Sequence, residues 1–135
     1  RVRLVRADVL LLLERHLPAG SLDEIHCYFP DPWPNEYRDG ERRVVRERTV
    51  TLFAKALKSG GLLHIATDVP DYAKHVERTL TAPASAADLF TLKDKETYEP
   101  GALTSRLRVR GLTKYERRAA ELGHSHITEF LYQRN

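Results

Sequence analysis

The sequence predicts an α/β fold built on a mostly parallel sheet with crossover helices. Three observations support this prediction: short apolar segments alternate with longer segments of helical periodicity, turn residues separate them, and a carboxylate follows each of the first three expected strands. Nearly continuous apolar strands are typical of a parallel sheet that is covered on both faces. The final strand is expected to be antiparallel.

The chain is expected to begin with a strand, a helix and a second strand. Residues 2–6 form the first strand, and Asp8 caps an apolar helix that continues through Arg15. Residues 18–21, Pro-Ala-Gly-Ser, make a turn. Residues 24–29 then form the second strand, which is apolar and aromatic along most of its length.

A helix, a third strand and another helix are expected next. From Val45 onward, apolar or small residues recur at helical spacing, and Gly60 stands where a left-handed C-terminal cap is expected. Residues 62–67 form a buried strand that ends in Asp68. Pro70 suits the first turn of the following helix, because its missing N–H would have no helical partner there.

The last third of the chain is expected to contain two strands and a helix. Residues 81–87 are small and include a proline, so they predict a loop, and residues 89–92 predict a short strand. Residues 115–122 form a helix that Gly123 ends. Residues 127–132 form the last strand, of β-branched and aromatic character.

Composition indicates a soluble globular chain with a single domain over residues 1–135. The chain has 41% hydrophobic and 30% charged residues and a net charge of +3, which permits a polyanionic partner without requiring one. The longest apolar run, residues 9–13, is too short to cross a membrane, and no charged leader precedes it, so we expect a cytoplasmic protein with no membrane partner. Methionine is absent and the first strand lacks a preceding turn, so we expect an N-terminally incomplete domain.

The most informative segment is residues 28–34, Tyr-Phe-Pro-Asp-Pro-Trp-Pro. Its three prolines fix their own φ and favour extended geometry in the residues before them, which are Phe29, Asp31 and Trp33. Ligands of open α/β sheets bind beyond the carboxyl ends of strands, so this stiff turn indicates a site for a polar, planar substrate. The alternative is a proline-rich surface loop with a packing tryptophan.

Three carboxylates, Asp8, Asp31 and Asp68, follow three successive expected strands. They are therefore expected at one edge of the sheet. Simple N-capping of helices is an equal explanation for Asp8 and Asp68. A capping role is less natural for Asp31, because the prolines after it delay the next helix.

The start of the last helix allows two interpretations. Thr113 and Glu116 match a capping box, which is a purely structural feature. Four cations precede or open this helix, however, and a helix N-terminus beside cations suits phosphate; they are Arg106, Arg108, Arg110 and Lys114. A second basic segment contains Arg38, Arg42, Arg43, Arg46 and Arg48. Acidic residues interrupt it, so a solvated helix with ion pairs explains most of its members.

Two other chemistries are disfavoured. A hydrolase triad of Cys27, His64 and Asp68 would need an exposed nucleophile, whereas a cysteine in the middle of a strand is usually buried and inert. His124 and His126 have no nearby cysteine or further histidine, so no metal site is expected.

The chain resembles the bacterial tRNA (guanine-N(7)-)-methyltransferases. Four landmarks carry the resemblance: Asp8 after a strand, Phe-Pro-Asp-Pro-Trp at residues 29–33, Ala-Thr-Asp at residues 66–68, and Thr-Lys-Tyr-Glu-x-Arg at residues 113–118 followed by Leu-Gly-His. The resemblance implies the C-terminal part of a Rossmann-like doubly wound methyltransferase sheet. It also implies S-adenosylmethionine as cofactor and tRNA as partner, and no oligomeric state follows from it.

The resemblance assigns roles to individual residues. Asp8 would contact the cofactor, and Asp31, the expected catalytic residue, would lie between cofactor and target base. The guanosine-binding residues would be Asn35, Asp68, Thr113, Lys114, Tyr115 and Glu116. The RNA backbone would meet Arg38, Arg42 and Arg43. The cations next to the last helix predict the same partner for Arg106, Arg108 and Arg110.

Two departures from the family pattern keep other functions open. Asn35 replaces the usual lysine, and acidic residues interrupt the segment that follows, which suggests a weaker grip on RNA. The alternatives are a catalytically inert RNA-binding relative and a small-molecule or amino-group methyltransferase. Trp33 and the cations of residues 106–114 favour RNA over a small molecule.

The expected chemistry needs no general base. Guanine N7 has a free lone pair and no proton, so methylation by a sulfonium requires in-line positioning. Positive charge moves onto the purine during transfer, and a fixed carboxylate such as Asp31 or Asp68 favours that transition state.

Overall fold

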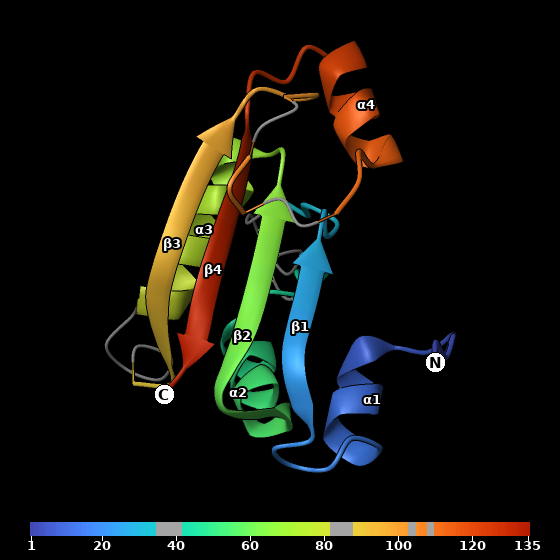
Figure 1. Cartoon of the computed structure of the whole chain (residues 1–135), viewed down its shortest axis with the longest axis vertical. Coiled ribbons are helices and arrows are strands. Elements are labelled where there is room, and N and C mark those ends of the chain that lie inside the picture. The colour runs from blue at the N-terminus through green and yellow to red at the C-terminus, as the bar shows by residue number, and fades with distance from the viewer. Residues whose placement is uncertain (35–41, 82–87, 103–104, 108–109) are drawn as a thin grey trace.

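The structure, a computed structural model, describes residues 1–34, 42–81, 88–102, 105–107 and 110–135. Helices and strands alternate along these residues. In chain order they are α1 (Val9–Arg15), β1 (Leu22–Tyr28), α2 (Glu47–Ala56), β2 (Leu57–Thr67), α3 (Pro70–Thr81), β3 (Phe90–Tyr98), α4 (Lys114–Glu121) and β4 (Ile127–Arg134). The strands form one sheet in the order β1-β2-β4-β3 (Figure 1). The predicted α/β class is confirmed.

Strand direction matches the prediction in part. β1 and β2 are parallel, with Ile25 beside Leu63, and β4 is antiparallel to β2, so the expected antiparallel final strand is confirmed. The short strand expected at residues 89–92 is the beginning of a longer one, β3, which is also antiparallel to β4. The parallel part of the described sheet is therefore the β1–β2 pair, narrower than the sequence suggests.

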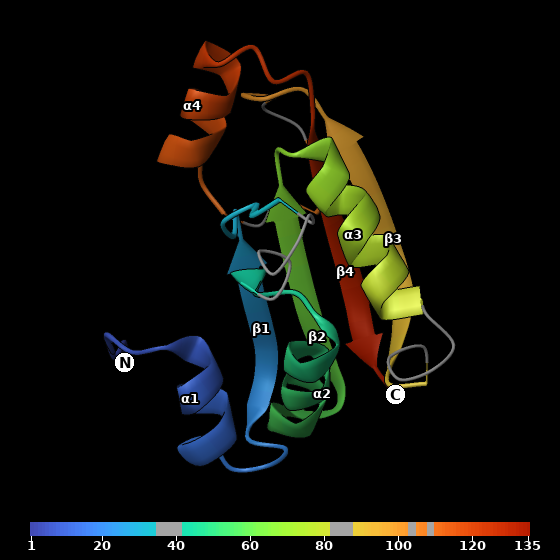
Figure 2. The same ribbon diagram turned by 180° about the vertical axis from the view of Figure 1, so that it is seen from behind.

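The two faces of the sheet differ in chemistry. α2 and α3 cover one face, and α1 lies beside β1 (Figure 2). The apolar core lies under these helices and includes Leu63, Ile65 and Phe130. On β1, Glu24 and His26 point to the opposite face and are exposed, whereas Ile25 and Cys27 pack against the core. The expectation that β1 is covered on both faces is wrong for this reason.

Two local predictions are also wrong. Residues 2–6 form no strand, and Val2 and Leu4 are almost fully exposed. An extended segment becomes a strand only when its backbone groups find ladder partners, and no described residue pairs with it. Gly60, with φ +77°, does not cap α2, because β2 begins directly at Leu57. It lies at the irregular start of β2, between two registers with β1.

Other boundaries follow the sequence. Asp8 caps α1 through bonds to the amides of Leu10 and Leu11. Gly123, with φ +73°, follows α4 as the predicted C-terminal cap. Within the described residues, the helices are too short or too polar for a membrane span.

Candidate functional site at the carboxyl ends of β1 and β2

The turn after β1 leaves the sheet at a residue of unusual backbone geometry. Phe29 has a φ of +51°, although the proline after it predicts extended backbone. Its N–H donates to the carbonyl of Ala66 on β2, at 2.8 Å, so the left-handed residue itself makes the last bond between the two strands. Such strain costs about 1–3 kcal/mol and is concentrated at functional sites.

Arg43 connects the turn after β1 to the start of α3. Its Nε donates to the Trp33 carbonyl at 2.5 Å and its Nη2 to Asp71 at 2.8 Å, and the residue is 2% exposed. The Arg43 hydrogen bond holds the pKa of the Asp71 carboxyl below its usual value. The sequence-based placement of Arg43 on the RNA backbone therefore needs correction: this side chain is a buried anchor for the turn.

The neighbouring Arg42 behaves differently. It is exposed, and its guanidinium lies 3.4 Å from the centre of the Trp33 ring. The stacked pair presents a cation at the turn that also contains the exposed Asp31. Asn35 and Arg38, which were also expected here, lie outside the described residues.

A second carboxylate marks the end of β2. Asp68 Oδ2 lies 2.7 Å from Nδ1 of His124, which follows α4. The two residues line a cavity of about 240 Å³ together with Val69, Pro70 and Ser125. Since both side chains are partly exposed, the pair can present a fixed carboxylate to a ligand at this edge.

The capping box at the start of α4 is confirmed. The Thr113 hydroxyl accepts from the Glu116 N–H at 3.2 Å, and Glu116 Oε2 accepts from the Thr113 N–H at 2.8 Å. Glu116 is fully buried, whereas Lys114 and Tyr115 are exposed. The Tyr115 ring stacks on Phe29 with 5.7 Å between centroids. The first turn of α4 thus meets the turn after β1.

A buried ionic cluster lies between this helix and the sheet. Arg110 Nη1 donates to Glu129 Oε1 at 2.6 Å, and its Nη2 lies 3.4 Å from Glu116 Oε1. The Tyr98 hydroxyl donates to Glu129, and His64 Nε2 lies 2.6 Å from Glu129 Oε2. Burial opposes ionisation of Glu129, but these three hydrogen bonds outweigh it and lower the pKa of Glu129. Arg110, with its side chain 12% exposed, was expected on RNA and instead joins the cluster.

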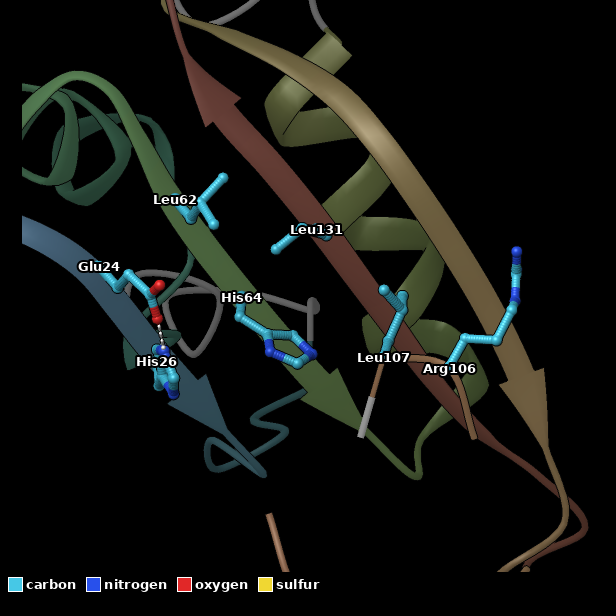
Figure 3. A pocket seen from close by; sticks show the side chains of 7 residues that line it. All are labelled: Glu24, His26, Leu62, His64, Arg106, Leu107 and Leu131. Atoms are coloured by element: carbon cyan, nitrogen blue, oxygen red, sulfur yellow. Dashed lines mark hydrogen bonds and ion pairs between the residues drawn. The ribbon is translucent and has the colours of Figure 1, made fainter. Parts of the chain in front are cut away.

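The cluster continues across the polar face of the sheet. The Tyr28 hydroxyl lies 2.9 Å from Nδ1 of both His64 and His26, and His26 Nε2 lies 2.7 Å from Glu24. Since the hydroxyl has one proton, it can donate to only one of the two ring nitrogens. His64, His26 and Glu24 border a cavity of about 180 Å³ whose apolar wall includes Leu131 (Figure 3).

The remaining sequence-predicted residues are spread out. Asp8 lies at the start of α1, exposed, and its Oδ1 accepts both capping bonds. Arg106 is exposed and pairs with Asp94 at 3.2 Å. Arg108 lies outside the described residues. Burial raises the pKa of Cys27 to about 11, and Cys27 faces the helix-covered side while His64 lies on the other, so this pair forms no catalytic dyad.

Sequence reasoning missed the members of the buried cluster on β3 and β4. Tyr98 and Glu129 look like ordinary members of alternating strands, and nothing near them in the sequence marks them. The available signal was a lone acidic residue within an otherwise β-branched and aromatic final strand. His124 is marked in the sequence only by the His-x-His pair and by the Leu-Gly-His landmark.

The family model described as "Putative methyltransferase" matches residues 1–129, and the chain belongs to this family. The structure aligns with that of a geranyl diphosphate methyltransferase in complex with GPP and sinefungin, with a TM-score of 0.50 and 14% identity over 92% of this chain and 51% of that one. That likeness concerns the fold alone.

The relatives found by sequence have a more specific name than the family model. The tRNA (guanine-N(7)-)-methyltransferase of Corynebacterium glutamicum is 40% identical over 98% of this chain and 49% of its own length. The protein of the same name from Nitrosomonas europaea is 37% identical over 98% of this chain and 54% of its own length. The chain thus spans about half the length of the curated relatives it matches.

Proposed function

We propose that the complete polypeptide containing these residues methylates N7 of a guanosine in the variable loop of tRNA, with S-adenosylmethionine as cofactor. The single observation that carries the proposal is the contact between the first turn of α4 and the turn after β1, through Tyr115 and Phe29. That contact joins the Phe-Pro-Asp-Pro-Trp turn to the Thr-Lys-Tyr-Glu segment, the two motifs that carry most of the resemblance to the tRNA (guanine-N(7)-)-methyltransferases.

The residues fit part of the cofactor site. Asp8 uses Oδ1 for both capping bonds, which leaves Oδ2 to accept from an amino group such as that of adenine. Asp31 is exposed at the turn, where a carboxylate can lie between cofactor and base. S-adenosylmethionine, when bound, supplies a methyl group on a sulfonium, which keeps the bonding electrons as the methyl leaves.

The chain's own residues would position the base. Asp68, held by His124, would accept hydrogen bonds from the N–H groups of the guanine edge. Thr113 and Glu116 would act indirectly, because their side chains form the capping box, whereas Lys114 and Tyr115 are exposed toward a ligand. The N7 lone pair forms the new bond, and the Asp31 carboxylate would favour the cation that develops on the purine.

The surface cations would bind the RNA backbone. Arg42 and Arg106 are exposed, so they can exchange their present contacts for phosphate, and phosphate contacts position RNA without reading its sequence. We assign the same role to Arg38 and Arg108, whose placement the structure does not describe. Arg43 and Arg110 would support the site from within.

The test uses labelled S-adenosylmethionine, the complete polypeptide and unmodified tRNA. We expect label in 7-methylguanosine of the variable loop, and none when that guanosine is replaced by 7-deazaguanosine, which has no N7 to methylate. Label on the 7-deazaguanosine tRNA, or on a small molecule in place of tRNA, would contradict the proposal. Binding of tRNA without transfer would indicate an inert relative.

A further inference from the structure

The Glu129 carboxylate occupies a position that stability alone does not explain. It is fully buried on the polar face of β4, beside Ala66 of β2 and Glu96 of β3. Burying an ion pair in place of apolar side chains is often neutral or unfavourable for stability. A buried cluster of two carboxylates and one guanidinium is therefore better explained by what it holds in place.

A continuous path of bonds leads from Glu129 to α4. Its Oε1 binds Tyr98 and Arg110, and these two groups lie 3.2 Å and 3.4 Å from Glu116 Oε1. Glu116 then uses its other oxygen, Oε2, to accept the Thr113 N–H at 2.8 Å. One carboxylate on the sheet is thus connected to the capping box through a single layer of side chains.

The same guanidinium also reaches the turn after β1. The Arg110 guanidinium carbon lies 4.6 Å from the centre of the Tyr28 ring and 5.3 Å from that of Phe29. The Phe29 ring in turn stacks on the Tyr115 ring of α4. Arg110 therefore lies between the turn after β1 and the first turn of α4, and its bond to Glu129 fixes its orientation.

We propose that Glu129 is a positioning residue for methyl transfer: through Arg110 and Tyr98 it sets the distance between α4 and the turn that carries Asp31. This inference rests on the proposed function. Glu129 touches neither cofactor nor base in this account. Its effect is on the alignment of Lys114 and Tyr115 with Asp31.

The test compares Glu129→Gln with wild type in the complete polypeptide. The amide keeps the shape but loses the charge that Arg110 pairs with, and its NH₂ group cannot accept from His64. We expect kcat/KM for tRNA methylation to fall by about 100-fold, since small displacements of positioning groups have effects of that size. S-adenosylmethionine affinity should stay within about twofold, because Asp8 and Asp31, the two residues proposed to contact the cofactor, are unchanged.

Hydrogen exchange provides a readout that does not depend on activity. Amides in the first turn of α4 should exchange faster in Glu129→Gln, while those of α2 keep their wild-type rates. Tyr98→Phe, which removes one hydroxyl, should change the same amides in the same direction and serves if Glu129→Gln does not fold. Glu77→Gln, which removes a surface pair with Lys95, is the matched control.

The outcomes separate the two proposals. Wild-type kcat/KM in Glu129→Gln, or a loss that merely follows lost cofactor binding or global unfolding, would overturn the positioning role. Unchanged exchange at α4 would also overturn it. If wild-type protein transfers no methyl group to tRNA, the proposed function fails, and faster exchange at α4 still supports the anchoring of this helix by Glu129.

Discussion

The carboxylate of Glu129 and the guanidinium of Arg110 meet at 2.6 Å, between the last strand and the helix that precedes it. The sequence predicts Arg110 at the RNA interface, whereas its side chain is 12% exposed and that of Glu129 is fully buried. Because of this pairing, Arg110 supports the site from inside the protein and does not face solvent like the exposed Arg106. Tyr98 and His64 also bind Glu129, so loss of this pair should displace several neighbouring side chains.

Acid should remove the contribution of Glu129 to stability. Its folded-state pKa is below the ordinary value of 4.5, so its ionised form stabilises the fold fully above that value, and the contribution is lost as pH falls through the lowered pKa. The difference in unfolding free energy between wild type and Glu129→Gln should therefore shrink in acid. Urea titrations at several pH values below and above 4.5 measure it. A difference that is constant with pH would contradict the expectation.

Loss of the capping hydroxyl should weaken α4. Thr113→Ala leaves the Glu116 N–H without its acceptor and should cost about 1 kcal/mol of stability, while Thr113→Ser should cost much less. The control is Thr51→Ala, because that hydroxyl donates to the Glu47 carbonyl within its own helix and caps no helix end. Equal effects of the two alanine variants would show that the capping box contributes nothing particular.

Arg42 and Arg43 should respond in opposite ways to alanine. Arg43→Ala removes a buried anchor and should cost more than about 2 kcal/mol of stability. It should also change the emission of Trp33, the single tryptophan of the chain. Arg42→Ala should change stability by less than about 0.5 kcal/mol.

The Arg42 variant should instead weaken tRNA binding and reduce the salt slope of affinity by about one. Denaturant unfolding and tRNA titrations at several salt concentrations separate the two residues. A salt slope that falls for Arg43→Ala and stays the same for Arg42→Ala would reverse the assignment.

His124 should matter for turnover and His126 should not. His124 fixes Asp68, whereas His126 is exposed and its ring forms a hydrogen bond with the neighbouring Ser125. His124→Ala should therefore lower kcat/KM for tRNA, because the proposed guanine-binding carboxylate loses its fixed orientation. His126→Ala is the matched control two residues away. Equal activity of the two variants would remove His124 from the site.

The sequence predicted the elements whose signals are local. The Asp8 cap, the Thr113–Glu116 box and the Gly123 end of α4 depend on a few neighbouring residues, and all are confirmed. Residues 2–6 have the composition of a strand but no ladder partner among the described residues, which no local pattern can reveal. Gly60 has the positive φ that was predicted for a helix C-terminal cap, but it lies within β2 and not at the end of a helix.

The site shows the same division. The proline turn after β1 and Asp68 after β2 could be found from their order along the chain, whereas Asp8 caps α1 and follows no strand among the described residues. The buried roles of Arg43 and Arg110 could not, since an arginine in a basic segment looks the same whether it faces phosphate or a distant carboxylate. Glu129 contacts partners from residues 64 to 110, and only the register of β4 brings them together.

The most direct test of the account is the effect of Asp31→Asn on methyl transfer by the complete polypeptide. Asparagine keeps the size of the side chain but removes the charge that favours the developing purine cation, so kcat should fall far more than tRNA affinity. Asp23→Asn, which removes a surface pair with Lys58, should match wild type. The measurement is the rate of 7-methylguanosine formation in tRNA at saturating cofactor. The account predicts a large loss of kcat for Asp31→Asn alone, and an unimpaired Asp31→Asn enzyme would contradict it.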